Sequence, residues 1–384
     1  MTFHEEEGRR HYWVVLVSTA MLTNPAGVLG AITPAIITSF VTEAGLPLDH
    51  ATQLVALEFA TMTIAIMGGP LLIKRIGNRR FAVVALLATL VGELVSTWVA
   101  EPFMEVARGI MGIGEGALYG LALAVLARTP RPARAFGVVV LTNQIVSALL
   151  LAMSGWSHRL YPASGIFTLM TFFLVATACF LPTIASHPIE RTEQITGDAA
   201  DSFAILPGIV GVFFFASAFG MVWPVIASIG QARGVSGHNT EALLGVSGIA
   251  GIVGAGSAIL LADRVGRMLP LVIGSVVMSL ALFGAFHWAF GVATPAILFL
   301  WSFLVPYYLG SATAADRTGR LVGVTGAMLP SGIAAGQAIA TYLLRQKNYE
   351  EIAPSAVTMQ IVGMLLILVL STRLWSIRRA DTLV

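Results

Sequence analysis

The chain has 384 residues, of which 57% are hydrophobic and only 11% are charged. So few charges could not cover the surface of a water-soluble domain of this size. The formal net charge is +2, and the basic residues are scattered rather than clustered, which excludes a nucleic-acid-binding surface. The single cysteine, Cys179, excludes an intramolecular disulfide.

Long apolar runs dominate the chain, and runs of more than about 18 residues predict membrane-spanning helices. The first run is too long for the core of a signal peptide, so we interpret it as a helix. The uncharged stretch 268–315 is too long for one helix and is broken at His287–Pro295, which contains Gly, Thr and Pro. In chain order the twelve predicted helices are 12–41, 50–73, 81–100, 103–127, 135–157, 163–185, 203–230, 239–262, 268–289, 293–314, 321–344 and 353–374.

The distribution of Lys and Arg between the connecting loops predicts the orientation. With the N-terminus in the cytoplasm, 17 of the 22 basic residues lie on the cytoplasmic side, four lie outside, and Arg108 lies inside a helix. We therefore expect both termini to be cytoplasmic.

The two halves of the chain repeat. Gly30 and Pro34 match Gly220 and Pro224 at an offset of 190 residues. The RIG of 75–77 matches the RVG of 264–266 at an offset of 189, and the ARAFG of 133–137 resembles the GRLVG of 319–323 at 186. Three matches at nearly one offset indicate a duplication, and parallel six-helix halves are typical of secondary transporters. The predicted organisation is a six-helix bundle over 1–185, a cytoplasmic linker over 186–202 and a second bundle over 203–384.

With these features the chain resembles the major facilitator superfamily over essentially its whole length. The family signature G-x-L-A-D-R-x-G-R-[KR] matches L-A-D-R-V-G-R at 261–267 and matches 74–79 less well, because Lys74 occupies the Asp position. A fourth-helix pattern, R-x-x-x-G-x-G-x-G, appears as Arg108 followed by Gly112, Gly114 and Gly116. The Gly-Pro motif of the family's drug:proton antiporters is missing from the fifth helix. The resemblance implies an all-α membrane fold of twelve helices in two pseudo-symmetric bundles.

Four ionisable residues fall within predicted membrane helices: Glu58, Glu93, Arg108 and Glu115. An intramembrane charge is costly unless it is paired or wetted, so each is a functional candidate. Arg108 and Glu115 are seven residues apart and share a helix face. One interpretation is a proton-coupling network, with Glu115 as the titrating group because it lies deepest. The alternative is a static ion pair of Arg108 with Glu58 or Glu93. Glu93 is the weakest candidate, because the third helix is peripheral in the resembled family and its carboxylate could reach only the membrane interface.

A second group of residues is polar or aromatic and lies at mid-depth on helices that line the cavity in the resembled family. These solute-site candidates are Asn24, Asn143, Gln144, Trp223, Tyr307, Tyr308 and Gln337. Alternatively, Tyr and Trp mark the membrane interface and the amides bond neighbouring helices.

The two signature loops are candidates for a gate on the cytoplasmic side. In the family, the signature Asp approaches the positive N-terminal end of a helix in the other half. By the repeat, Asp263 would meet the start of the fifth helix near Arg134, whereas Lys74 would present a cation to the start of the eleventh near Arg320. We therefore expect an asymmetric gate in which Asp263 is dominant. The remaining gate residues are Arg264, Gly266, Arg267, Arg75 and Gly77, and Gly266 would permit the tight turn that a short helix connection needs.

No catalytic, nucleotide-binding or metal-binding motif stands in a plausible context, so we expect no enzyme, cofactor or metal site. The leading hypothesis is a monomeric, proton-coupled secondary transporter of the inner bacterial membrane, exporting a small, partly hydrophobic or aromatic organic solute. Two alternatives stay open. One is a uniporter or an importer of an organic anion or sugar with static buried ion pairs, and the other is a non-transporting receptor or lipid scramblase on the same fold.

Overall fold

The structure is a computed structural model that describes residues 3–98, 103–126, 132–161, 165–185, 199–261, 264–313 and 322–381. Each predicted segment is mainly helical in its described part, and the described residues contain no strand. In chain order the elements are α1 (Phe3–Thr42), α2 (Leu48–Ile76), α3 (Asn78–Trp98), α4 (Phe103–Leu126), α5 (Pro132–Leu160), α6 (Gly165–Ala178), α7 (Leu181–Ala185), α8 (Ala199–Val222), η1 (Trp223–Val225), α9 (Ile226–Ala232), α10 (Gly237–Leu261), α11 (Met268–His287), α12 (Phe290–Thr313), α13 (Val322–Arg345), η2 (Tyr349–Glu351) and α14 (Ile352–Asp381).

Two predicted helices are interrupted. The segment predicted over 163–185 divides into α6 and the short α7, and the segment over 203–230 divides into α8, the 3₁₀ turn η1 and α9. The second break coincides with Pro224, whose ring removes a backbone donor from the helix. Its repeat partner Pro34 is accommodated inside the continuous helix α1.

Ten helical stretches of the described chain are long and apolar enough to cross a membrane. They do not include α3 and α4, the helices that carry Glu93, Arg108 and Glu115. Ten of the twelve predicted spans are thus confirmed by length and composition. The other two, α3 and α4, have 21 and 24 residues and are therefore long enough for spans. They contain the buried charged residues Glu93, Arg108 and Glu115.

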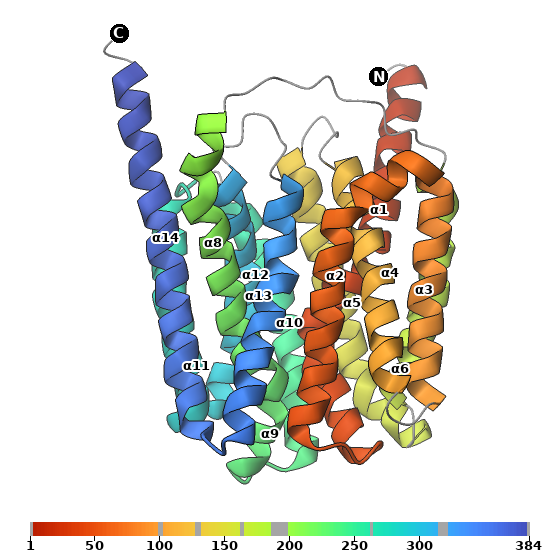
Figure 1. The fold of residues 1–384 in the computed structure, drawn as a ribbon, viewed down its shortest axis with the longest axis vertical. Coiled ribbons are helices and arrows are strands. Elements are labelled where there is room, and N and C mark those ends of the chain that lie inside the picture. The colour runs from red at the N-terminus through yellow and green to blue at the C-terminus, as the bar shows by residue number, and fades with distance from the viewer. Residues whose placement is uncertain are drawn as a thin grey trace.

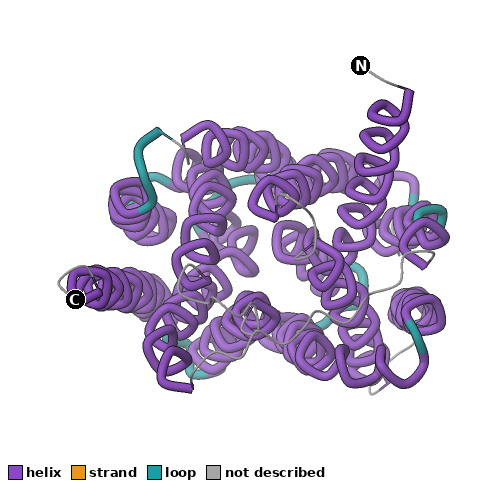
Figure 2. The backbone as a smooth tube through the Cα atoms, turned by 90° about the horizontal axis from the view of Figure 1, so that it is seen from above, coloured by secondary structure: helices purple, strands orange, loops and turns teal. Residues whose placement is uncertain are grey.

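The helices stand side by side, and α1 begins at the same end of the bundle at which α14 ends (Figure 1). We call this the terminal end and the opposite one the distal end. Seen along their axes, the helices form one closely packed group (Figure 2). Between the halves, α2 packs along α13 and α5 packs along α10. In the sequence repeat, α2 corresponds to α10 and α5 corresponds to α13. The α2–α13 contact is therefore the repeat counterpart of the α10–α5 contact, as expected when two parallel halves are related by a two-fold axis.

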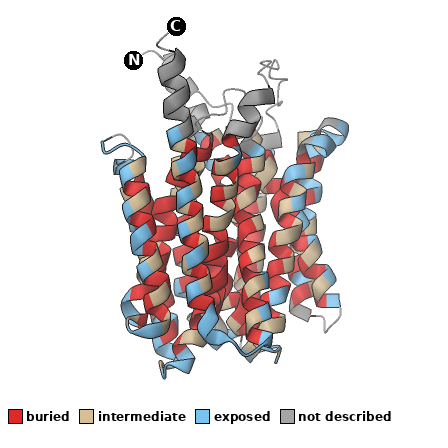
Figure 3. Ribbon diagram, turned by 60° about the vertical axis from the view of Figure 1, so that its left-hand side comes forward, coloured by how far each residue is buried: buried red, intermediate tan, exposed pale blue. Residues whose placement is uncertain are grey.

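Burial follows the pattern of a membrane protein. The buried residues face the middle of the bundle, and the exposed and intermediate ones face outward (Figure 3). Large apolar side chains lie on the outer surface, including Val292 at 74% exposed and Ile64 at 69% exposed. Such a surface is stable in hydrocarbon and would aggregate in water.

Two connecting turns contain a glycine with a positive φ angle, and the one at Gly266 was expected from the sequence. Gly77 and Gly266, which match under the repeat, have φ angles of 79° and 71°. A side chain would be strained there, so glycine is required for the turn.

Candidate functional site

The four intramembrane charges are brought together by close packing around α4. Successive glycines of α4 face its two neighbours: Cβ atoms at Gly112 and Gly116 would overlap the backbone of α2 at Glu58 and Met62, and one at Gly114 would overlap α3. These glycines let the backbones of α2 and α3 approach α4 closely. As a result, carboxylates on α2 and α3 reach a guanidinium on α4.

Arg108 is the centre of this cluster. Its Nη1 atom lies 3.3 Å from Oε2 of Glu58 and 3.6 Å from Oε2 of Glu93. All three side chains are fully buried. One guanidinium therefore serves two carboxylates from two neighbouring helices, so both pairings suggested by the alternative interpretation of these residues are present.

Two aromatic rings enclose the guanidinium. The Cζ atom of Arg108 lies 4.9 Å from the ring centre of Phe40 and 5.3 Å from that of Phe167. The two rings come from α1 and α6 and are themselves 5.1 Å apart. A cation over aromatic faces is attracted by their negative π density, most strongly where water is excluded. The rings and the carboxylates together compensate the buried charge of Arg108.

Glu115, seven residues after Arg108 on α4, is the third carboxyl group of the cluster. It is fully buried, and its strongest electrostatic partner among the charged groups is Glu58. It makes no ion pair with Arg108 in the described part of the chain. The cluster therefore holds three carboxyl groups and one guanidinium, with Glu115 as the carboxyl group that the guanidinium does not contact.

Glu93 differs from its sequence-based expectation. We expected its carboxylate to reach only the membrane interface, but it is fully buried against Arg108. The reason is the packing of α3, because a Cβ at Gly92 would overlap the backbone of α4 at Ala107 and Met111. This close approach turns the neighbouring Glu93 into the interior.

Three amide candidates of the first half lie on α1 and α5. Asn24 is fully buried, and its Oδ1 has no hydrogen-bond partner among the described residues. Asn143 accepts a hydrogen bond from Thr23 Oγ1 at 3.3 Å, so it links α5 to α1. Gln144 is 7% exposed at the packed face between α5 and α10, and its Oε1 likewise has no partner in the described chain. Asn143 thus bonds a neighbouring helix, whereas Asn24 and Gln144 keep a free acceptor.

Trp223 forms a contact between the two halves. Its Nε1 donates a hydrogen bond of 2.9 Å to the backbone oxygen of Ala31 in α1. Nearby, Gly30 of α1 faces Ile333 of α13. We call the Trp223–Ala31 and Gly30–Ile333 contacts the seal. Asn24 lies seven residues before Ala31 in α1, which places it about 10 Å from the seal toward the terminal end.

A stack of aromatic rings continues from Trp223 into the second half. Phe219 and Phe215 of α8 alternate with Trp301 and Tyr308 of α12. The order of the rings is Trp223, Phe219, Trp301, Phe215 and Tyr308. The distances between the centres of consecutive rings are 5.8, 4.1, 5.0 and 4.1 Å. Each ring of the stack thus packs against its neighbours on α8 and α12, a geometry that stabilises aromatic pairs.

The remaining solute candidates belong to α12 and α13. The Tyr308 hydroxyl lies 2.9 Å from Ser275 Oγ and accepts a hydrogen bond from Gln360 Nε2 at 3.4 Å, all within the second half. Tyr307 is 3% exposed, and its hydroxyl has no partner among the described residues. Gln337 is fully buried, with neither side-chain polar atom bonded within the described ranges.

A second contact joins the halves at the distal end. Arg345, in the last turn of α13, donates to Asp49 Oδ2 at 2.9 Å and to Gln53 Oε1 at 2.6 Å in the first turns of α2. Sequence reasoning missed this contact, and also the rings of Phe40 and Phe167 around Arg108. No local signal marks either, because each joins residues that are distant in the chain.

The candidate gate residues are only partly placed. Asp263 and Arg320 lie outside the described residues, and the side chains of Lys74 and Arg134 are not described. Arg75 and Arg264 are exposed. Arg267 donates a hydrogen bond of 3.1 Å to the backbone oxygen of Gly310 in α12, within its own half. The asymmetric gate stays a prediction.

Comparisons with known proteins agree with this architecture. Residues 15–336 match the sequence profile of the Major Facilitator Superfamily. The chain is similar to the xylose transporter XylE from E. coli in a partially occluded, inward-open conformation, with a TM-score of 0.70 and 13% identity over 94% of this chain and 97% of that one. It is also similar to the human organic anion transporter MFSD10 (TETRAN), with a TM-score of 0.66 and 14% identity over 94% and 99% of the two chains. No match is found among curated proteins.

At such identities the two structures share the fold with this chain, and the profile match extends over most of its length. The protein belongs to the Major Facilitator Superfamily and is a multi-pass integral membrane transporter, not an enzyme.

Proposed function

We propose that this protein is a proton-coupled secondary transporter that moves a small, partly hydrophobic or aromatic organic solute by alternating access, with export as its direction. One observation carries the proton coupling: the cluster has three buried carboxyl groups and one guanidinium, and the guanidinium pairs with only two of the three. If all three were ionised, two negative charges would stay uncompensated inside the membrane. Uncompensated buried charges are strongly unfavourable, so the cluster is stable only when protons or a changed environment offset them.

The residues of the cluster have different roles in this proposal. Arg108, held by Glu58, Glu93 and the two rings, forms the fixed part. Glu115 exchanges the proton, because it is the carboxyl group that Arg108 does not contact. Movement of α4 relative to α2 during transport would change the distance between Glu115 and Glu58, and with it the stability of the bound proton.

The solute pathway is proposed from partnerless polar groups. Asn24, Gln144, Tyr307 and Gln337 are buried and keep acceptors or donors without partners in the described chain. Buried polar groups are normally satisfied, so such groups are candidates for contact with a solute. XylE is by name a sugar transporter and MFSD10 an organic anion transporter, so the fold accommodates both classes. Within the described part of the chain, Arg108 is the only fully buried arginine, and it is already paired, which disfavours an anion.

The orientation is part of the proposal. With the termini in the cytoplasm of a bacterial inner membrane, the distal contacts of Arg345 and the seal at Trp223 would close the outer side. The solute would then reach Asn24 and Tyr307 from the cytoplasm. The proposed transporter is a monomer.

The test begins with purified protein and a thermal-shift screen of neutral sugars, aromatic amines and aromatic carboxylates, because a bound solute stabilises the folded state. The strongest stabiliser is then used in proteoliposomes with an imposed pH gradient. We expect the wild-type protein to accumulate it against its concentration gradient. Glu115→Gln should retain exchange of the solute but lose accumulation. Glu105→Gln, which alters a half-exposed carboxylate of the same helix that lies 3.6 Å from His50 Nε2, serves as the matched control.

Two results would contradict the proposal. Flux that is indifferent to the pH gradient and to Glu115→Gln would identify a uniporter, an alternative that the pairing of Arg108 with Glu58 and Glu93 also supports. Binding of a stabiliser without any flux would identify a receptor.

The seal at Trp223 provides a further prediction. Trp223→Phe keeps the ring in the stack but removes the donor to Ala31. One buried hydrogen bond contributes about 0.5–1.5 kcal/mol, so the population open on the distal side should rise roughly two- to twelvefold. The measurement is the rate at which an impermeant maleimide labels Thr341→Cys in a Cys179→Ser background. Trp288→Phe, at an exposed position, should leave this rate unchanged.

A further inference from the structure

The connection between α2 and α3 is strongly basic. Residues 74–80 read KRIGNRR, with four basic residues and no acidic one, and no Asp or Glu occurs between Glu58 and Glu93. The repeat counterpart, DRVGRML at 263–269, has two basic residues and one acidic residue. The α2–α3 connection lies at the terminal end of the bundle (Figure 1). The first half thus carries an excess of positive charge there that the counterpart lacks.

The arginines of this connection are not committed to partners within the protein. Arg75, Arg79 and Arg80 are exposed. Within the described part of the chain none of them forms an ion pair or a side-chain hydrogen bond. In the counterpart, by contrast, Arg267 donates a hydrogen bond to the backbone oxygen of Gly310. Three guanidinium groups of the α2–α3 connection are therefore available to an anion.

The backbone of the connection holds these charges together. Gly77 has a φ angle of 79°, its N–H donates to the backbone oxygen of Ile73, and its own backbone oxygen accepts from the N–H of Phe81. α3 therefore begins directly after this glycine, with Arg75 before it and Arg79 after it. The positive N-terminal end of α3 lies at the same place and adds to the attraction for an anion.

An exposed apolar stripe runs from these charges along the outside of α3. Starting from Arg80, the positions four, seven and eleven residues further on share its face of the helix. They hold Val84, Leu87 and Val91, which are 59%, 54% and 50% exposed. At about 1.5 Å per residue the stripe is about 16 Å long, close to the hydrocarbon thickness of one leaflet, about 15 Å. The charges thus stand at one end of an apolar surface that is as long as one leaflet is thick.

We propose that the α2–α3 connection binds the headgroup of an anionic phospholipid in the leaflet at the terminal end, with an acyl chain along the stripe on α3. Guanidinium groups match phosphate oxygens in charge and in hydrogen-bond geometry. A basic residue next to a membrane helix strengthens the attraction to anionic lipid about fivefold. The proposal depends on the membrane fold alone and is independent of the solute and of proton coupling.

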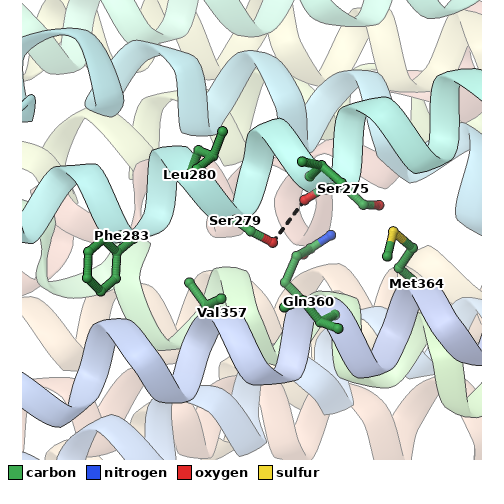
Figure 4. Close-up of a pocket in the computed structure, with 9 residues that line it drawn as sticks. Ser275, Ser279, Leu280, Phe283, Val357, Gln360 and Met364 are labelled. Atoms are coloured by element: carbon green, nitrogen blue, oxygen red, sulfur yellow. Dashed lines mark hydrogen bonds between the residues drawn. The ribbon is translucent and has the colours of Figure 1, made fainter.

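The match requires charge and apolar surface together. A soluble phosphate compound or an acidic protein would use the arginines but leave the stripe uncovered. A zwitterionic phospholipid would cover the stripe, but its own ammonium group offsets the attraction between its phosphate and the arginines. The groove between α11 and α14 in Figure 4 provides only the second feature, because none of its lining residues, Ser275 and Gln360 included, is charged.

The test uses the full-length protein in phosphatidylcholine nanodiscs that contain a trace of a photoreactive probe. The two probes are a phosphatidylglycerol and a phosphatidylcholine with the same diazirine-bearing acyl chain. After irradiation, peptide mass spectrometry locates the labelled residues. We expect the anionic probe to label 74–91 at least about fivefold more than the zwitterionic one.

Variants identify the groups responsible. Arg75→Gln combined with Arg79→Gln and Arg80→Gln should remove the preference for the anionic probe, whereas lysine at the same three positions should keep most of it. Arg264→Gln, which alters an exposed arginine of the counterpart connection, is the matched control and should leave the preference unchanged.

Three results would overturn the proposal. Equal labelling of the wild-type segment by both probes would leave the arginines as determinants of membrane orientation only. A preference that survives the triple glutamine variant would place the anion elsewhere. Displacement of the anionic probe by an excess of soluble glycerophosphoglycerol, the headgroup without its acyl chains, would identify a site for a soluble phosphate compound rather than for a lipid.

Discussion

Arg108→Met is expected to destabilise the protein by about 3–5 kcal/mol, because it leaves carboxylates buried without their counter-charge. Methionine retains much of the apolar stem between Phe40 and Phe167, so the loss is chiefly one of charge. Thermal unfolding of the purified protein in detergent measures the effect. The difference from wild type should shrink at acidic pH, because protonated Glu58 and Glu93 need no cation.

The control for this prediction is the neutral cluster. Arg108→Met combined with Glu58→Gln and Glu93→Gln removes the guanidinium and both carboxyl groups that pair with it, and its stability should return most of the way to wild type. Replacing a whole buried ion pair by neutral residues is often harmless, whereas removing one partner is not. If the single and the triple variants were equally unstable, packing around Arg108 rather than charge would hold these helices together.

Gly112→Ala is the second change with a large expected effect. A Cβ at this position would overlap the backbone oxygen of Glu58 and the hydroxyl of Thr61, so α2 must move away from α4. Forced overpacking costs about 1–3 kcal/mol. The displacement also carries Glu58 away from Arg108, so both the melting temperature and the transport rate should fall.

The matched control lies one turn earlier on the same helix. A Cβ at Gly109 would meet Thr61 Cγ2 at 3.9 Å, an ordinary contact. Gly109→Ala should therefore be neutral or stabilising by up to about 1 kcal/mol, because alanine is the better helix former. Equal stability of the two variants would show that α4 and α2 separate at little cost, and would refute the role assigned to this glycine.

Both experiments bear on the same feature of the protein. The charges in the first half are positioned by backbone proximity, and the charged pairs stabilise the helices that bring them together. The second half instead has an aromatic stack, from Trp223 to Tyr308. The duplicated scaffold therefore carries two different interiors, and the contact of Trp223 with Ala31 is where they meet.

The sequence by itself determined the membrane class, the helical segments, the repeat and the identity of the intramembrane charges. Each of these depends on local composition, because transfer of a segment into hydrocarbon depends chiefly on its own residues. The breaks within the sixth and seventh segments were not predicted, since proline is tolerated in one membrane helix and interrupts another, as Pro34 and Pro224 illustrate.

Only the tertiary structure decided which groups meet. Arg108 pairs with Glu58 across 50 residues, Trp223 bonds Ala31 across 192, and Arg345 reaches Asp49 across 296. The burial of Glu93 depends on how closely α3 approaches α4, and the enclosure of Arg108 depends on rings from α1 and α6. Such contacts depend on how the packed helices are rotated and spaced. Hydropathy specifies neither the rotation nor the spacing, because lipid solvates every apolar face of a helix equally well.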